Sequence, residues 1–239
     1  MTSKKQLKDI ANILRRDVLK MTSYAGSGHP TSCMSCAEIM SSLFFHEMSY
    51  DTQNASNPDN DEFILSKGHA APILYSALFR AKAIHHHPFS LRKLKSPLEG
   101  HPVPSSHFPW AKVATGSLGQ GLSVGLGFAL AAKLQGRTFR TYVLLGDSEL
   151  AEGSNYEAMQ LASHYKLSNL VAIVDVNKFG QRGETMLGHD LKSYMKRFSS
   201  FGWKTIMING HKISHILKAL NKAKRSGKPT AIIAKTFKG

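Results

Sequence analysis

The sequence has little cysteine and little acidic charge. Only two cysteines occur in 239 residues, Cys33 and Cys36, which excludes a disulfide scaffold and favours a reducing compartment. Asp and Glu number 16 against 31 Lys and Arg, which gives a formal net charge of +15. A positive excess of this size favours an anionic partner, such as a phosphorylated ligand, nucleic acid or a membrane surface.

The sequence also lacks a clear leader peptide or membrane span. Residues 1–17 are charged throughout and have no apolar core of the kind found in signal peptides. Residues 113–132 carry no charge over the length of a spanning helix, and Gly121 and Gly125 form a small-xxx-small pair. Glycines and polar residues interrupt this stretch, so we interpret it as a glycine loop that enters a buried helix. A cytoplasmic protein without a membrane span is expected.

The second half of the chain alternates between apolar strands and helical segments. Strands are expected at 141–147, 169–177, 203–208 and 230–235, and helices at 152–166, 190–200 and 212–226. Strands that are apolar on both faces and separated by helices predict a parallel sheet with helices on both faces. No internal repeat, low-complexity tract or linker is evident, so residues 1–239 are expected to form one α/β domain.

The first half is less regular. The apolar spacing predicts a helix over 4–23 with a basic outer face, followed by a loop over 25–32. Ser32 could cap a second helix that runs to about Met48. A short strand is expected at 63–66 and a helix from about Ala70. Residues 96–116 are rich in proline and irregular, and loops of this length in compact domains are usually functional.

Two of the expected strands end in oxygen ligands. Asp147 ends the first and Asn177 the second, one βαβ unit apart. Ligands collect at the carboxyl ends of parallel strands, where these two side chains could reach one point. A carboxylate and an amide oxygen suit a hard divalent cation. Alone, each residue would more simply be a helix cap or a turn residue, but the pair at this spacing favours the cation.

Residues 115–127 are interpreted as a glycine-rich loop that leads into a helix. The free backbone N–H groups at the start of that helix would favour the binding of a phosphate. The glycine spacing does not fit a dinucleotide fingerprint, and no strand precedes it. The segment GLSVG also matches the Gly-x-Ser-x-Gly pattern of hydrolases, but Ser123 lacks the strand that a nucleophile elbow requires.

Three histidines, His29, His69 and His101, lie beside glycine or proline in loops. A single histidine is usually a surface or packed residue, but three in similar settings suggest imidazoles gathered at one site for polar contact and proton transfer. The run at 85–87 is interpreted as exposed. Cys33 and Cys36 have no second ligand pair, so we interpret them as small buried residues and not as half of a zinc site.

Seven segments, in this order, resemble transketolase, and most of all its animal-type branch. They are AGSGHPTS, FILSKGHAAPILY, GHPVP, ATGSLGQGL, GDSELAEGSNYEAM, LVAIVDVNKFGQ and PTAIIAKTFKG. The pattern from Asp147 to Asn177 is similar to the family's thiamine diphosphate signature, Gly-Asp-Gly followed by Asn about one βαβ unit later. The likeness runs from about residue 5 to the end and implies the N-terminal, pyrophosphate-binding domain alone.

The resemblance implies a role for particular residues of this sequence. Asp147, Asn177 and the carbonyl of Phe179 would bind Mg²⁺ or Ca²⁺. The other residues that would contact thiamine diphosphate are Ser32, His69, Gly116, Leu118, Ser148 and Lys238. Three residues would be catalytic: His29 and His101 would line the substrate channel, and Glu152 would connect the two active sites of a dimer.

The sequence also departs from the family pattern. In the family, the glutamate that activates the cofactor lies in a pyrimidine-binding domain, which is expected to be absent here together with the C-terminal domain. Ser148 replaces the third glycine of the signature, and at a positive φ it would cost about 1 kcal/mol. The resemblance therefore implies a transketolase-type transferase of two-carbon ketol units between sugar phosphates that is inactive as an isolated chain. A complementary chain would complete it, in a homodimer or heterotetramer.

Two other classes of function compete with this one. A transketolase-like chain could be a non-catalytic binding or regulatory module, which Ser148 and the end of the sequence at Gly239 favour. The retained Asp147, Asn177 and loop histidines favour the enzyme. Nucleic-acid binding depends only on the charge of +15 and is supported by no recognised module.

Overall fold

A computed structural model describes residues 2–239 and contains a parallel sheet in the order β1-β2-β3-β5-β4. All four neighbouring pairs are parallel. The strands are β1 (Glu62–Leu65), β2 (Thr141–Gly146), β3 (Leu170–Val176), β4 (Lys204–Asn209) and β5 (Thr230–Lys235). The parallel α/β sheet predicted from the apolar strands is confirmed.

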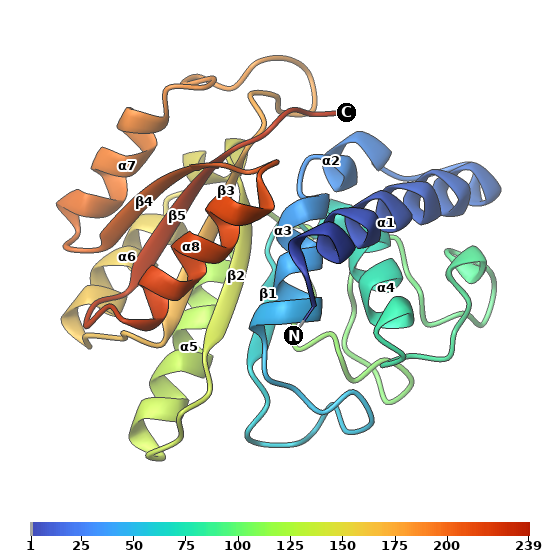
Figure 1. Ribbon diagram of the computed structural model, residues 1–239, viewed down its shortest axis with the longest axis horizontal. Helices are drawn as coiled ribbons and strands as arrows, with labels where there is room; N and C mark the ends of the chain where they lie inside the picture. Colours follow the sequence, from blue (N-terminus) through green and yellow to red (C-terminus); the bar gives the residue numbers. More distant parts are fainter. Residues whose placement is uncertain (1) are drawn as a thin grey trace.

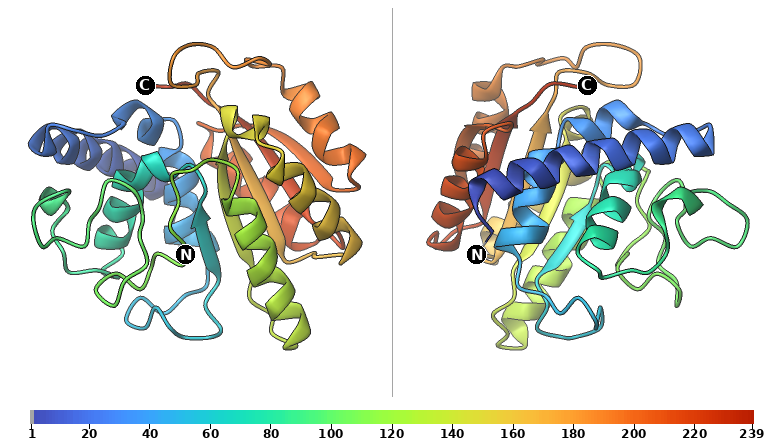
Figure 2. Two further views of the ribbon diagram at one scale, coloured as in Figure 1. Left: turned by 180° about the vertical axis from the view of Figure 1, so that it is seen from behind. Right: turned by 45° about the vertical axis from the view of Figure 1, so that its right-hand side comes forward.

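Helices cover both faces of this sheet (Figures 1 and 2). The face towards the viewer in Figure 1 carries α1 (Lys4–Ala25), α3 (Ala37–Ser42), α4 (Ala71–Arg80) and α8 (Ile213–Lys224). The opposite face carries α5 (Gly121–Leu134), α6 (Ser154–His164) and α7 (Leu191–Ser200). The short α2 (Pro30–Met34) lies at one end of the sheet. No helix among residues 2–239 is both long enough and apolar enough to cross a membrane.

Side chains alternate between the two faces of the sheet along each strand, so the domain has a separate hydrophobic core on each face. In β2, Tyr142 and Leu144 pack with the layer that contains α1, whereas Val143 and Leu145 pack with α5 and α6. All four side chains are buried. Because successive residues of a strand point to opposite faces, a strand covered on both sides must be apolar at every position.

The helix expected to run from Ser32 to about Met48 is instead broken into three pieces, so this expectation was wrong. Ser32 lies inside α2 and caps nothing, because α2 begins at Pro30, and α3 is followed by a π-helical turn over Leu43–Glu47. The carbonyl of Ser32 accepts hydrogen bonds from the Ser35 hydroxyl (3.1 Å) and the Lys67 ammonium (2.8 Å). A local side-chain contact from Ser35 and a distant one from Lys67 thus occupy this carbonyl where the helix breaks.

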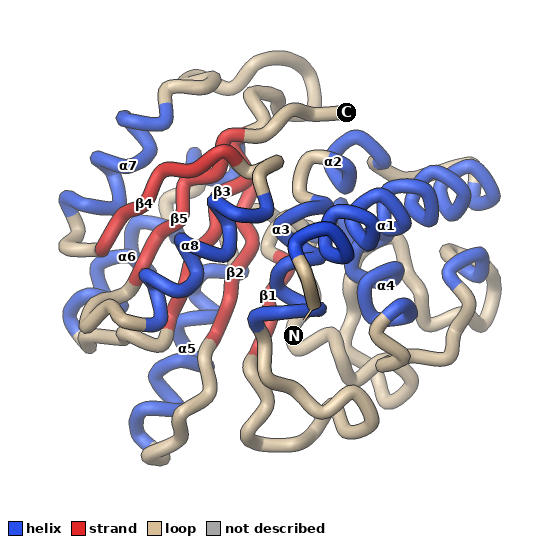
Figure 3. Tube along the Cα trace, viewed as in Figure 1, coloured by secondary structure: helices blue, strands red, loops and turns tan. Residues whose placement is uncertain are grey.

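Long loops gather at the end of the sheet to which the strands run, and a second extended loop region covers residues 91–120 (Figure 3). The latter contains no regular element, as its proline content predicted. It leads into α5, which is packed so closely on β2 that a Cβ on Gly125 would lie 2.3 Å from Val143 Cγ2. A Cβ on Gly127, two residues further along the same helix, would meet nothing within 4 Å.

These two glycines give a matched test of the packing of α5 on the sheet. Gly125→Ala should lower the free energy of unfolding by about 1–3 kcal/mol, because the methyl group overpacks the core. Gly127→Ala should raise it by roughly 0.5–1 kcal/mol through helix propensity. Denaturant unfolding of both variants checks this, and a Gly125→Ala protein as stable as Gly127→Ala would contradict the observed packing.

Candidate functional site

A cavity of about 480 Å³ opens at the carboxyl edge of the sheet. It brings together every predicted site residue except one. These residues are His29, Ser32, His69, His101, Gly116, Leu118, Asp147, Ser148, Asn177, Phe179 and Lys238. They come from the start of α2, from the segments that follow β1, β2, β3 and β5, and from residues 101–118 of the long loop before α5. Segments far apart in the sequence therefore form one site, as the strand-end argument predicted.

Glu152 is the exception. It follows the 3₁₀ turn Ser148–Ala151, its side chain is exposed, and it does not line the cavity. A Cβ on Gly119 would lie 2.5 Å from Glu152 Cβ, so Glu152 lies against the outer side of the glycine loop. Its predicted role between two active sites stays a prediction.

Asp147 and Asn177 are oriented by the turn that follows β3. One carboxylate oxygen of Asp147 accepts from the Lys178 amide (2.8 Å) and the other from the Ser148 amide (2.9 Å). The side-chain oxygen of Asn177 accepts from the Phe179 amide (3.1 Å). Lys178 itself has a φ of 79°, in the left-handed region that a residue with a Cβ rarely occupies. The turn thus presents Asn177 and Phe179 to the same cavity as Asp147.

The environment of Asp147 fits a cation. Burial raises the pKa of its carboxyl to about 6, in spite of the hydrogen bond from the Lys178 amide. Within residues 2–239, no Lys, Arg or His forms an ion pair with it. The same residues contain no group of three His, Cys, Asp or Glu that could hold a metal, so a cation here would depend on amide and carbonyl oxygens as well. Those are the ligands that Mg²⁺ and Ca²⁺ prefer.

The backbone at Ser148 does not meet the condition of positive φ on which its expected cost depended. Ser148 begins a 3₁₀ turn and is not among the residues with positive φ. The Asp147 side chain caps this turn. A glycine at position 148 would therefore relieve no backbone strain, and the serine hydroxyl is free to line the cavity.

A buried ion pair beneath the cavity was not predicted. The Lys67 ammonium contacts the Asp175 carboxylate, and these side chains are 1% and 0% exposed. Asp175 also accepts from the hydroxyls of Ser35 and Thr236. Burial alone would raise the pKa of Asp175, but the charge and hydrogen bond of Lys67 hold it below its ordinary value. The only signal in the sequence was a lysine placed directly after an apolar strand.

A second buried carboxylate fixes the glycine loop. Glu149 is fully buried and accepts from the Ser66 hydroxyl, the Gly119 amide (2.8 Å) and the Gly146 amide (3.0 Å). Burial raises the pKa of this carboxyl, and the same three hydrogen bonds counteract the rise. Glu149 thereby links the ends of β1 and β2 to the loop that carries Gly116 and Leu118.

The three loop histidines do meet at the cavity. The rings of His29 and His69 lie edge to face with centroids 5.5 Å apart. Burial, with the Lys67 charge, lowers the pKa of His69 to about 3, so that this imidazole is neutral at pH 7. Burial and the Arg92 charge also lower the pKa of His101. His101 packs on Gly116, where a Cβ would lie 2.8 Å from the ring.

The remaining candidates fall where the sequence suggested. His85, His86 and His87 are exposed, and Ser123 is exposed on α5. Cys33 and Cys36 are buried in the core, and burial raises the pKa of the Cys33 thiol to about 12. Lys238 lines the cavity and donates to the Gly180 carbonyl (2.8 Å), while burial lowers its pKa.

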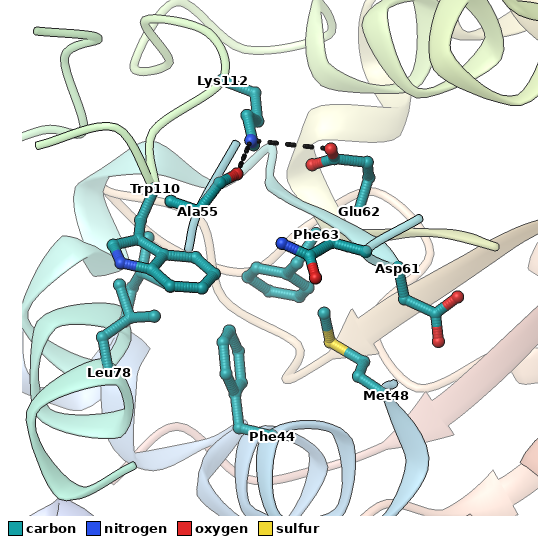
Figure 4. A pocket seen from close by; sticks show the side chains of 11 residues that line it. Phe44, Met48, Ala55, Asp61, Glu62, Phe63, Leu78, Trp110 and Lys112 are labelled. Carbon is teal, nitrogen blue, oxygen red and sulfur yellow. Dashed lines mark hydrogen bonds and ion pairs between the residues drawn. The ribbon is translucent and has the colours of Figure 1, made fainter. Parts of the chain in front are cut away.

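A separate pocket, shown in Figure 4, is too small to compete with this site. It lies between Phe44, Phe63 and Trp110 and encloses about 20 Å³, close to the space of one water molecule. Lys112 spans its rim, donating to the Ala55 carbonyl (2.7 Å) and pairing with Glu62 (3.5 Å). This pocket is a packing gap beneath the 91–120 loop.

Comparisons with known proteins agree with the geometry. The family model "Transketolase, thiamine diphosphate binding domain" matches residues 6–239. Human transketolase is 53% identical over 98% of this chain, and bovine transketolase-like protein 2 is 48% identical over all of it. The chain spans 37% and 38% of these two proteins. The crystal structure of Campylobacter jejuni transketolase superposes with a TM-score of 0.88 at 36% identity, over 96% of this chain and 37% of that one.

The buried ion pair gives a test of what holds the site together. Lys67→Met should lower the free energy of unfolding by about 3–5 kcal/mol, because it leaves the Asp175 carboxylate buried without a counter-charge. The exposed pair Arg137–Asp59 supplies the control, since Arg137→Met should cost less than about 1 kcal/mol. Thermal and denaturant unfolding check both values. Equal losses in the two variants would refute the importance of the buried pair.

Proposed function

Because this chain belongs to the transketolase family of thiamine diphosphate-binding domains, we propose that its cavity binds thiamine diphosphate together with a divalent cation. The observation that carries the proposal is the buried Asp147 carboxylate, which forms no ion pair within residues 2–239 and shares one cavity with Asn177 and Phe179. The reaction that we propose is the transfer of a two-carbon ketol unit between sugar phosphates.

The residues of the cavity would divide the binding of the cation, the diphosphate and the thiamine among them. Asp147, Asn177 and the Phe179 carbonyl would hold Mg²⁺ or Ca²⁺, whose charge offsets that of the diphosphate. Four further side chains that line the cavity would donate hydrogen bonds to phosphate oxygens. They are Ser32, His69, Ser148 and Lys238. The backbone at Gly116 and Leu118, fixed by Glu149, would meet the thiamine.

The chemistry that thiamine diphosphate supplies when bound is carbanion stabilisation. The protein residues would orient the substrate and move protons. His29 and His101 lie at the cavity wall where they can exchange a proton with a substrate oxygen, and the lowered pKa of His101 favours its neutral, proton-accepting form. His69, with a pKa of about 3, would position phosphate oxygens as a neutral group.

We infer that the site is completed by a further domain. The chain spans about 37% of the length of the curated relatives that it matches. The family resemblance assigns the activating glutamate to a pyrimidine-binding domain, and a homodimer or heterotetramer would place that domain over the open cavity. A cytoplasmic location is part of the same proposal. The alternative, a non-catalytic transketolase-like module, predicts cofactor binding or partner binding without turnover.

Removal of the Asp147 carboxylate tests the cation site. Asp147→Ala should abolish cation-dependent binding of thiamine diphosphate, because the diphosphate then meets no offsetting charge. Titration calorimetry with Mg²⁺ and thiamine diphosphate measures this. Asp9→Ala, an exposed acid on α1, should bind as the unchanged chain does. If Asp147→Ala retained full affinity, with its fold intact by circular dichroism, the proposed site would be wrong.

A second test concerns completion of the active site. The isolated chain should show no ketol transfer from xylulose 5-phosphate to ribose 5-phosphate, because the family resemblance assigns the glutamate that activates the aminopyrimidine to a pyrimidine-binding domain. Activity should appear when a chain with the pyrimidine-binding and C-terminal domains is added. Turnover by the isolated chain would contradict the need for a partner. Failure of complementation, with cofactor binding intact, would favour the non-catalytic module.

A further inference from the structure

The residues that follow β5 pass along the edge of the cavity. In this C-terminal segment, residues 236–239, the Thr236 amide donates to the Val176 carbonyl (3.0 Å) and the Thr236 hydroxyl to Asp175. The Lys238 ammonium then reaches the Gly180 carbonyl (2.8 Å) and lines the cavity. The position of Lys238 therefore depends on what holds Phe237, the residue between these two contacts.

Phe237 lies between two histidines. Its ring stacks on His211, with centroids 5.9 Å apart and planes within 5°, and meets the edge of His189 at 5.5 Å. The side chain is 61% exposed, so burial does little to fix it. Each histidine also makes a hydrogen bond to the backbone of the segment: His189 to the Thr236 carbonyl (2.9 Å) and His211 to the Phe237 amide (3.0 Å).

These two hydrogen bonds respond differently to protonation. A carbonyl only accepts, so His189 Nε2 donates to Thr236, and it still donates when the ring gains a proton. A backbone amide only donates, so His211 Nε2 must accept from Phe237. The proton of neutral His211 then lies on Nδ1, which donates to Glu38 Oε2 (3.0 Å). Protonation of His211 turns its Nε2 into a donor and removes the bond to Phe237.

The charges around His211 support this behaviour. Glu38 of α3 receives two hydrogen bonds from Arg15 of α1 (2.7 and 2.6 Å). Burial would raise the pKa of Glu38, but the hydrogen bonds of His211 and Arg15 hold it below its ordinary value. Glu38 therefore stays ionised and binds His211 in either state. Other charged groups near the segment are Lys212, Lys238, Lys235, whose ammonium lies 5.9 Å from the centroid of the Phe237 ring, and the Asp175–Lys67 pair, whose carboxylate accepts from the Thr236 hydroxyl.

We propose that His211 is a positioning residue. Its unprotonated Nε2 accepts the hydrogen bond from the Phe237 amide, here called the latch, and thereby holds Lys238 at the cavity. Protonation of the ring breaks this hydrogen bond and releases residues 236–239. Only the effect on cofactor binding rests on the proposed function, since the latch itself is a property of the cofactor-free chain. Because Lys238 would then be held less firmly at the cavity, diphosphate binding would weaken in acid.

The latch can be tested on the cofactor-free chain by NMR with ¹⁵N-labelled phenylalanine. The Phe237 amide, assigned by its loss in Phe237→Leu, should shift and lose exchange protection, corrected for intrinsic rate, as the His211 ring titrates. His211→Gln keeps an acceptor that does not titrate, so the amide should stay protected at all pH values tested. His211→Phe keeps the stacked ring without an acceptor, so protection should be lost throughout. His189→Gln should retain the pH response.

Titration calorimetry with Mg²⁺ and thiamine diphosphate then tests the link to the cavity. At pH 8, His211→Phe should bind roughly three- to tenfold more weakly than His211→Gln, the value of one hydrogen bond. On acidification from pH 8 through the range in which the Phe237 amide responds, the unchanged chain should lose about fivefold more affinity than His211→Gln. Titration of Asp147 affects all variants alike and cancels in this ratio.

The outcomes separate the two proposals. The latch would be overturned if the chemical shift and exchange protection of the Phe237 amide changed neither with protonation of His211 nor in His211→Phe. If the Phe237 amide changes as expected but His211→Phe and His211→Gln bind the cofactor with equal affinity, the role of the latch in positioning Lys238 would be overturned. Absence of thiamine diphosphate binding in every variant would overturn the proposed function, and the amide measurements would still decide the latch.

Discussion

The buried ion pair between Lys67 and Asp175 holds the edge of the sheet on which the cavity is built. It joins Lys67, two residues beyond β1, to Asp175 near the end of β3, and the hydroxyls of Ser35 and Thr236 add the ends of α2 and β5 to the same cluster. Two charges buried at this depth are stable only when both are paired and hydrogen-bonded. The segments that supply them must therefore keep their relative positions, and those segments carry the walls of the cavity.

Two neighbouring aspartates illustrate how this arrangement divides its charges. Asp175 has its cation built into the protein, and its pKa is held low. Asp147 has none, and the charge of Asp175 adds to burial in raising its pKa. Asn177 lies between them, with its side-chain nitrogen 3.4 Å from Asp175 and its oxygen turned towards the Phe179 amide. The Asp175 carboxylate thus stabilises the structure through its ion pair with Lys67, whereas the Asp147 carboxylate is buried without an ion pair among residues 2–239.

The features that could be predicted from the sequence are those governed by local pattern. Doubly apolar strands such as β2 and β3 predict a covered parallel sheet, and the strand-end positions of Asp147 and Asn177 predict their meeting. The features that could not be predicted depend on contacts between distant segments. Lys67 and Glu149 look like surface residues in the sequence because nothing local reveals their partners. The break after Ser32 and the backbone of Ser148 likewise follow from neighbours that only the folded chain brings close.

The left-handed conformation of Lys178 has a further consequence. A lysine there costs about 1 kcal/mol relative to a relaxed backbone, and the turn is kept by the hydrogen bond from its amide to Asp147. A glycine at this position would remove the strain, yet it would also loosen the turn that presents Asn177 and Phe179 to the cavity. Attempts to make this domain more heat-resistant by glycine substitution at this position would therefore trade the pre-organisation of one cavity wall for stability.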